Sequence, residues 1–343
     1  MKILIIGGTK FLGRHLINAA LKRNHTVTLF NRGKYSIENF ENVEQIHGDR
    51  NFDLEKLTAQ NWDAVIDTCG YLPNAVNTAV EVLKEKSGQY VLISSISSYS
   101  DFSQPNFDEN APLAKLNDEQ LKRADEIDVM GEISGFTLGD LYGGLKVLCE
   151  SAVATAMPNR HLIIRAGLIV GAYDTTDRFT YWVDRVARGG EILAPGNPNR
   201  FIQFIDAFDL ARWIVKMIER QTSGIFNATG KPYELTMEKL LSEIKIISQS
   251  DAKFTWVSEK FLNENNIWAW SEMPLYLPES DEESKGFLLA NIDKALESGL
   301  ELRPINETIK DVLAWSKSKT GALKAGITAE REIELLQKWR EQR

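Results

Sequence analysis

Short runs of continuously apolar residues recur along the first half of the chain, separated by polar turns and by segments with helical spacing. They predict six strands, at residues 2–6, 25–30, 43–49, 62–70, 89–95 and 160–167. Continuous rather than alternating apolar runs are typical of strands that are buried on both faces. Strands that alternate with helices imply right-handed βαβ units. The sequence therefore predicts an α/β fold with a doubly wound parallel sheet.

The second half of the chain has a different texture. Residues 172–200 are rich in Asp, Arg, Gly and Pro, and a short strand and an amphipathic helix follow at 201–219. A strand at 224–230 comes next, and a helix at 236–248 for which Thr236 is a plausible N-cap. We expect a smaller α/β C-terminal substrate-binding domain. The expected domains are residues 1–168 with 201–228 returning to them, residues 169–200 with 229–318, and a helical tail at 319–343.

Large aromatic side chains gather in residues 254–290. They are Trp256, Phe261, Trp268, Trp270, Tyr276 and Phe287. Such a cluster favours a small second core. The alternative is that a few of these side chains line a substrate pocket between the domains.

Composition narrows the class of protein. The chain has 343 residues, of which 43% are apolar and 26% charged, as in ordinary soluble proteins. The net charge of −8 disfavours a broad nucleic-acid surface, so no nucleic-acid partner is expected. No apolar run approaches the length of a membrane span, and residues 3–6 are too short for a signal peptide. We therefore expect a soluble, cytoplasmic protein without a membrane partner.

Neither the cysteines nor the histidines form a metal-ligand motif. Cys69 and Cys149 lie far apart and suggest neither a disulfide framework nor a zinc site. The four histidines show no ligand spacing either. The sequence predicts no metal site.

The stretch GGTKFLG, residues 7–13, follows the first predicted strand and opens a helix. A strand, a glycine-rich turn and a helix present free N–H groups and a positive dipole end to an anion. Gly7 would permit the tight turn, and Gly13 would let the helix approach the sheet closely. The alternative is a plain turn. The position at the first βα turn of an extended array favours a dinucleotide site in a Rossmann-type fold.

The second predicted strand ends at Asn31 and Arg32, where a dinucleotide's adenosine ribose would lie. A carboxylate at this point favours NAD, whereas arginine can accept a 2′-phosphate. Arg32 and the loop cation Lys10 therefore favour NADP, with NAD still possible. The alternative is that Arg32 stacks on the adenine or is merely solvated.

Tyr142 and Lys146 are four residues apart, so on a helix they project from one face. An ammonium group stabilises a nearby phenolate and lowers the pKa of the phenol from about 10. Such a pair can exchange a proton with a substrate hydroxyl or carbonyl while a nicotinamide exchanges hydride. Ser94, Ser95, Ser97 and Ser98 end the fifth predicted strand, and one hydroxyl could hold the substrate oxygen. We expect at least three of them only to satisfy backbone groups in the turn.

Taken together, these motifs resemble the extended short-chain dehydrogenase/reductase superfamily, in its NAD-dependent epimerase/dehydratase branch. The resemblance runs from Met1 to about Ser318. It implies that Tyr142 is the acid/base, that Lys146 also holds the nicotinamide ribose, and that Ser95 is the catalytic hydroxyl residue. The resemblance implies further cofactor contacts in the glycine loop and in three segments, HGDR (47–50), IDTCGY (66–71) and IIRAGLIVGAYD (163–174). These are Thr9, Lys10, Phe11, Leu12, Asp49, Arg50, Cys69, Gly70, Tyr71, Ala166 and Leu168.

The chain also departs from the usual family pattern. Lys10 replaces the middle glycine, which gives the GGTxFxG loop of atypical members, some of which are chloroplast stem-loop RNA-binding proteins outside redox chemistry. The Arg-Asp-Phe-Ile run of nucleotide-sugar epimerases corresponds to Ile202–Ile205 here, with Arg200 two residues earlier. Dehydratases usually carry an acidic residue where this chain has Ile96.

The motifs predict an NAD(P)-dependent oxidoreductase or epimerase that acts on a small hydroxyl or carbonyl substrate, with dehydration the weakest possibility. The alternative is a non-catalytic module on the same fold that senses a dinucleotide or binds RNA. By analogy with the family, a homodimer through the helix of Tyr142 is possible.

Overall fold

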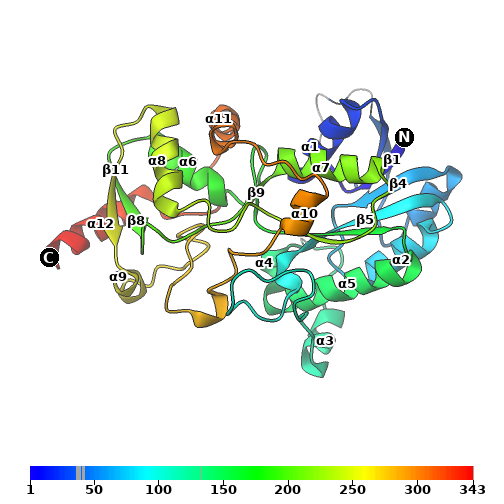
Figure 1. The fold of residues 1–343 in the computed structure, drawn as a ribbon, viewed down its shortest axis with the longest axis horizontal. Coiled ribbons are helices and arrows are strands. Elements are labelled where there is room, and N and C mark those ends of the chain that lie inside the picture. The colour runs from blue at the N-terminus through cyan, green and yellow to red at the C-terminus, as the bar shows by residue number, and fades with distance from the viewer. Residues whose placement is uncertain (36–39, 41–42, 132, 343) are drawn as a thin grey trace.

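The computed structural model describes residues 1–35, 40, 43–131 and 133–342, and its largest element is a seven-stranded parallel sheet (Figure 1). The spatial order is β10-β6-β5-β4-β1-β2-β3. The strands in chain order are β1 (Lys2–Ile6), β2 (Thr26–Asn31), β3 (Glu44–His47), β4 (Trp62–Asp67), β5 (Ser87–Ser95), β6 (His161–Ala166) and β10 (Gly224–Ala228). The predicted doubly wound parallel sheet is confirmed.

Helices cover both faces of this sheet, and β1 shows why its sequence is continuously apolar. Ile3 and Ile5 pack in the core beneath α1 (Phe11–Leu21) and α7 (Ala207–Glu219). The residues between them, Leu4 and Ile6, pack in the opposite core beneath α2 (Pro73–Leu83) and α5 (Tyr142–Ala156). Alternate side chains of one strand therefore enter two different cores. We call the sheet and these four helices the sheet unit.

A second, smaller unit is built around two parallel strands, β8 (Glu191–Pro195) and β11 (Lys253–Val257). Its helices are α6 (Arg178–Ala187), α8 (Met237–Ser248), α9 (Glu259–Glu264), α11 (Ile305–Ser316) and α12 (Ala329–Glu341). Thr236 caps α8 by accepting from the N–H of Lys239 at 3.2 Å. The helix α12 is part of this body, because Leu335 and Leu336 are buried and Arg185 pairs with Glu332.

Shorter elements complete the fold. The strands β7 (Ile169–Val170) and β9 (Ile205–Asp206) pair where the chain crosses between the units. The remaining elements are η1 (Leu54–Ala59), η2 (Ile96–Ser98), α3 (Asp118–Asp125), α4 (Gly135–Leu138), η3 (Gly139–Leu141), η4 (Glu282–Ser284) and α10 (Asp293–Glu297). In Figure 1, α3 projects from the body below α5. Among the described residues, no helix has both the length and the apolar character that a membrane crossing requires.

The aromatic cluster of residues 254–290 divides in two. Phe261 and Tyr276 are buried in the core of the second unit, as the composition predicts. Trp268 is 71% exposed, so the prediction of a core position is wrong for this residue. Its indole lies outside because the chain makes a turn here, where Met273 and Glu272 donate their N–H groups to the Trp268 carbonyl.

A buried ion pair joins α5 to the sheet. The Arg165 guanidinium on β6 donates to the Glu150 carboxylate on α5 at 2.7 Å, and the two side chains are 1% and 4% exposed. Ser94 and Ser98 donate to the same carboxylate from the end of β5 and from η2. Arg165 also lies 4.8 Å from the centre of the Tyr99 ring. Both charges are therefore paired and hydrogen-bonded, which burial requires.

We expect Glu150→Gln to lower the free energy of unfolding by about 3–5 kcal/mol, because it leaves the Arg165 charge buried without a counter-charge. Urea denaturation followed by circular dichroism measures the change. Glu301→Gln is the control, because Glu301 is 65% exposed and its pairs with Arg212 and Lys216 lie on the surface. Equal effects of the two substitutions would contradict the prediction.

Candidate functional site

The predicted site residues come together because the sheet is parallel. Each lies in or just after the carboxyl end of a strand, at the start of α1, or on α5, and the strand ends form one edge of the sheet. The strand β1 has β2 on one side and β4 on the other, so the strand order reverses at β1. Ligands of doubly wound sheets bind in the crevice at such a switch point.

The glycine loop has the close geometry that a phosphate cradle needs. Gly7 and Gly8 adopt φ of 91° and 80°, a region that side chains rarely enter. A Cβ on Gly13 would lie 2.2 Å from the Cα of Gly8, so only glycine lets α1 approach the loop here. The N–H of Gly8 donates to Thr68 Oγ1 at 3.2 Å. Sequence reasoning missed Gly8 and Thr68, although the Gly-Gly doublet and the position just after β4 were signals for them.

Lys10 does not disturb this loop. Its backbone is extended, with φ of −109°, and it stands at the N-cap position of α1. Its ammonium lies 4.1 Å from the centre of the Tyr35 ring. Thr9 accepts at its carbonyl from Arg14 Nε at 3.2 Å, and Leu12 is buried beneath the loop. The helix begins at Phe11, so the lysine variant leaves the strand-loop-helix geometry intact.

One side chain at the end of β2 makes a hydrogen bond within the turn that follows the strand. Asn31 is buried and accepts from the N–H of Gly33 at 2.8 Å. Arg32 Nη1 lies 3.9 Å from Asp49 Oδ2, across the edge of the sheet. The Asp49 carboxylate therefore lies near Arg32, the residue on which the predicted preference for NADP depends.

The Arg50 guanidinium is hydrogen-bonded to other groups of the protein. Its guanidinium donates to Asp67 at 2.9 and 2.8 Å and to the Cys69 carbonyl at 2.8 Å. Burial acts to raise the pKa of Asp67, but the Arg50 charge and hydrogen bonds hold that pKa below its usual value. Burial raises the pKa of the Cys69 thiol to about 11, so it stays protonated near neutral pH. The pair of Arg50 with Asp67 therefore holds the turn that carries Cys69 and Gly70.

Lys146 places its charge at the ends of β4 and β5. Its ammonium donates to the Gly70 carbonyl at 2.7 Å and to the Ile93 carbonyl at 2.6 Å, and the residue is 2% exposed. It lies 5.4 Å from the centre of the Tyr71 ring. A lysine ammonium has three donors, so one remains beyond these two carbonyls.

Tyr142 is the first residue of α5 and is half-buried. Its ring centre lies 6.4 Å from that of Tyr71. The helix α4 packs against the Tyr142 ring, because a Cβ on Gly135 would lie 3.2 Å from its Cε1 atom. Tyr142, Tyr71 and Lys146 therefore form one cluster next to the glycine loop and the turn after β4.

The four serines after β5 have different partners. Ser94 and Ser98 donate to the Glu150 carboxylate, so the expectation that they serve only backbone groups is wrong for these two. Ser95 accepts from the N–H of Ser97 at 3.1 Å, which leaves its hydroxyl proton free to be donated. Ser95 pairs in register with Ala166 on β6, and Leu168 follows Ala166 by two residues.

Sequence reasoning also missed Arg178, the first residue of α6. Its guanidinium lies 5.1 Å from the centre of the Trp270 ring, and its Nε donates to Thr176 Oγ1 at 3.3 Å. Its signal was the run of Asp and Arg in residues 172–200, which composition alone could not assign to the site.

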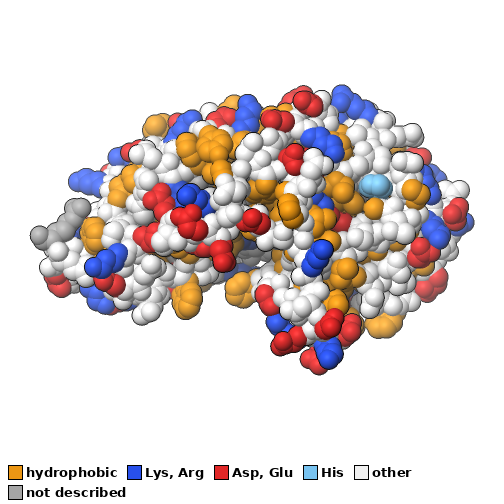
Figure 2. All heavy atoms as spheres, turned by 60° about the horizontal axis from the view of Figure 1, so that its bottom comes forward, with side chains coloured by type: hydrophobic (Ala, Val, Ile, Leu, Met, Phe, Trp, Pro, Cys, Tyr) orange, Lys and Arg blue, Asp and Glu red, His pale blue; other side chains and the backbone are white. Residues whose placement is uncertain are grey.

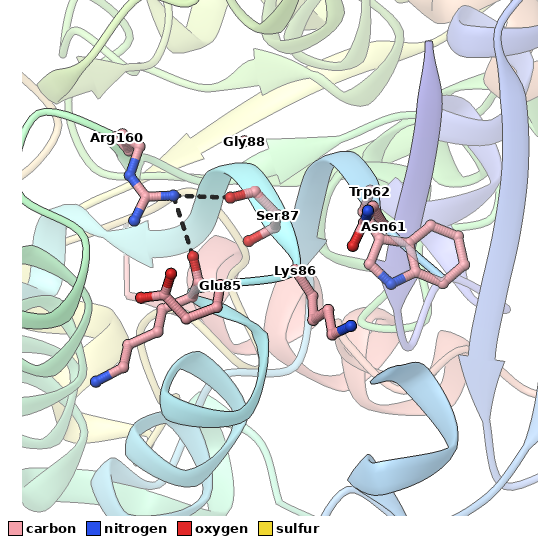
Figure 3. Close-up of a pocket in the computed structure, with 8 residues that line it drawn as sticks. Asn61, Trp62, Glu85, Lys86, Ser87, Gly88 and Arg160 are labelled. Atoms are coloured by element: carbon pink, nitrogen blue, oxygen red, sulfur yellow. Dashed lines mark hydrogen bonds between the residues drawn. The ribbon is translucent and has the colours of Figure 1, made fainter. Parts of the chain in front are cut away.

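The surface is hollowed between the two units on the face drawn in Figure 2. A separate pocket at the opposite, amino-terminal edge of the sheet is lined by Asn61, Trp62, Lys84, Glu85, Lys86, Ser87, Gly88 and Arg160 (Figure 3). There, Arg160 donates to the carbonyls of Lys84 and Ser87 at 3.1 and 2.8 Å. Ligands of parallel sheets bind at the other edge, so this pocket is not the candidate site. The described residues contain no group of three His, Cys, Asp or Glu side chains arranged to hold a metal ion.

Residues 3–118 match the model of the NAD dependent epimerase/dehydratase family. The fold is similar to that of a UDP-glucuronic acid 4-epimerase from Bacillus cereus in complex with NAD, with 17% identity, a TM-score of 0.64, and coverage of 93% of this chain and 99% of that one. It is also similar to a UDP-Glc/GlcNAc 4-epimerase from Campylobacter jejuni, with 16% identity, a TM-score of 0.67 and the same coverage.

A curated relative, the chloroplast stem-loop binding protein of 41 kDa b from Arabidopsis thaliana, is 36% identical over 252 residues. The match covers 68% of this chain and 59% of the relative, so this chain spans less than two thirds of the relative's length.

We expect Gly13→Ala to weaken NADH binding roughly tenfold or more and to lower Tm, because the added methyl group forces α1 away from Gly8. NADH fluorescence titration and thermal unfolding measure the two effects. Asn18→Ala, on the exposed face of the same helix, is the control and should leave both unchanged. NADH binding of normal strength to Gly13→Ala would show that the close approach is unimportant for the site.

Proposed function

We propose that the chain is an NAD-dependent oxidoreductase or epimerase acting on a small hydroxyl or carbonyl substrate, because its residues 3–118 match the model of the NAD dependent epimerase/dehydratase family. Tyr142, Lys146 and Ser95 would act on the substrate. The observation that carries the proposal is the position of the Lys146 ammonium, held between two strand-end carbonyls on the helix that begins at Tyr142.

The chain's residues fit a dinucleotide. The left-handed Gly7 and Gly8 and the close approach of Gly13 bring bare backbone to the amino end of α1, where a pyrophosphate binds. The turn after β4, held by Arg50 and Asp67, would lie beneath the cofactor. When bound, NAD supplies a nicotinamide that accepts or returns a hydride.

The three side chains divide the proton chemistry. The Tyr142 oxygen would take a proton from a substrate hydroxyl or return one to a carbonyl, and the Lys146 ammonium would hold the nicotinamide ribose. Ser95 keeps a free hydroxyl proton with which to hold the substrate oxygen. For epimerisation, the same residues would hold a ketone until the hydride returns to its other face.

We propose NAD rather than NADP as the preferred cofactor. The Asp49 carboxylate lies 3.9 Å from Arg32, and the Lys10 ammonium lies over the Tyr35 ring. Both cations therefore already have a partner within the protein, which weakens the case for a 2′-phosphate at this point. The solved Bacillus cereus structure contains NAD. Titration of the protein with NADH and NADPH compares the two directly, and tighter binding of NADPH would reverse this preference.

A second candidate function is the binding of a nucleic-acid stem-loop. The name of the Arabidopsis relative, at 36% identity, favours it. The net charge of −8 opposes it, because phosphate backbones are bound through Lys and Arg. A mobility-shift titration with a stem-loop RNA at 0.15 M salt distinguishes the two, and tight RNA binding without NADH binding would replace the redox proposal.

We expect Tyr142→Phe to bind NADH as wild type does but to turn over substrate about 10²–10⁴-fold more slowly, because it lacks the proton-transferring hydroxyl. NADH formation at 340 nm, with NAD and a panel of hydroxyl substrates, detects oxidation. Chromatography of UDP-sugars detects epimerisation, in which the hydride returns and no NADH accumulates. Tyr233→Phe is a matched control, because Tyr233 is 50% exposed and lies outside the cluster of Tyr142, Tyr71 and Lys146. Full turnover by Tyr142→Phe would remove this residue from the mechanism.

A further inference from the structure

The helix α1, which follows the glycine loop, carries a histidine that contacts the chain where it leaves the sheet unit. Nε2 of His15 lies 3.0 Å from the carbonyl oxygen of Ala172. A carbonyl oxygen only accepts, so Nε2 carries the proton of the neutral ring and donates it. Ala172 lies in residues 171–177, between β7 and the first helix of the second unit, α6, and we call these residues the crossing segment. His15 therefore joins the helix of the glycine loop to the chain that enters the second unit.

Aromatic rings extend this contact to α11 of the second unit. The half-buried imidazole of His15 lies 6.2 Å from the ring centre of Phe11 and 6.0 Å from that of Tyr173. The Tyr173 ring in turn lies 5.9 Å from the ring of Trp315 on α11. We call His15, Ala172, Tyr173 and Trp315 the joint. It connects α1, the crossing segment and α11 through one hydrogen bond and a row of ring contacts.

Three charged groups act on His15, and they are already paired with one another. The Asp206 carboxylate, at the start of α7, accepts from Arg303 Nε at 3.1 Å and from the Thr308 hydroxyl at 2.6 Å. Nη1 of Arg303 donates to Asp311 on α11 at 2.7 Å. Among the residues that the structure describes, no Asp or Glu oxygen lies within 4.0 Å of the His15 ring nitrogens. A proton added to this ring would therefore create a cation without an ion-pair partner.

We propose that His15 makes the joint acid-sensitive: the neutral ring holds the crossing segment against α1, and a proton added at Nδ1 loosens this contact. The proposal goes beyond the proposed function, because it requires neither NAD nor a substrate. Burial lowers the pKa of His15 below its usual value of 6.5, and the Arg303 charge acts in the same direction. The carboxylates of Asp206 and Asp311 act against this shift without reversing it.

The sign of the effect follows from proton linkage. The unfolded chain takes up the His15 proton at a higher pH than the folded chain does, so His15 makes the fold less stable as the pH falls below 6.5. Asp209 on α7 acts in the opposite sense. Its Oδ2 accepts from the N–H of Arg303 at 2.9 Å, and burial raises its pKa to about 6, so its contribution to stability is lost as the pH rises through this value. The test therefore compares variants at each pH.

The test measures Tm and hydrogen exchange of the full-length protein at pH 8 and pH 5. His15→Gln keeps an N–H donor but takes up no proton. We expect its Tm to equal that of wild type at pH 8 and to fall roughly 1–3 °C less on acidification. Hydrogen exchange of the crossing segment, corrected for the intrinsic effect of pH, should become about twofold or more faster at pH 5 in wild type but not in His15→Gln.

His161→Gln is the matched control, because Nδ1 of His161 lies 3.1 Å from the Met157 carbonyl, a similar contact that stays within the sheet unit. The proposal is supported if His161→Gln responds to acid as wild type does while His15→Gln does not. It is overturned if both variants respond alike, or if exchange of the crossing segment in wild type does not change with pH.

Proton NMR titration of the histidine rings tests the same proposal without a variant at His15. The chain has four histidines, so the His15 signal of the wild-type protein is assigned by elimination with His25→Gln, His47→Gln and His161→Gln. We expect this signal to titrate below pH 6.5, as burial requires. A midpoint at or above 6.5 overturns the proposal even if His15→Gln does not fold.

Discussion

The buried ion pair of Glu150 with Arg165 decides where the helix α5 stands on the sheet. Both charges are almost wholly out of water, so they must meet each other with good geometry or the fold loses several kcal/mol. Their contact joins α5 to β6, and the hydroxyls of Ser94 and Ser98 extend it to the end of β5. Lys146 stands one turn before Glu150 on the same helix. The position of the ammonium at the strand ends therefore depends on a pair that has no chemical role of its own.

Cations at this edge of the sheet differ in how fully the protein itself satisfies them. Arg50 and Arg165 each have a buried carboxylate, and both act as supports. Lys146 has two backbone carbonyls, which hold its position without neutralising its charge. Arg178 has one hydroxyl and an aromatic face. The two cations with buried carboxylates therefore support the fold, whereas the carbonyls that hold Lys146 leave its positive charge in place.

The glycine loop shows how a sequence departure can leave a site unchanged. Lys10 replaces a glycine at a position where the backbone is extended, with φ of −109°, which any residue adopts. The conformations that require glycine occur at Gly7 and Gly8, and the close approach that excludes a side chain occurs at Gly13. The loop therefore keeps its form because the substitution falls outside the constrained positions.

The sequence by itself determined the parallel sheet, because continuously apolar strands such as β1 can be stable only with helices on both faces. It also determined the pairing of Tyr142 with Lys146, since four residues span one turn of a helix. Local patterns cannot show which partner a long side chain reaches. Only the tertiary structure therefore decided that Arg50 meets Asp67, that Ser94 and Ser98 meet Glu150, and that Trp268 lies outside the core.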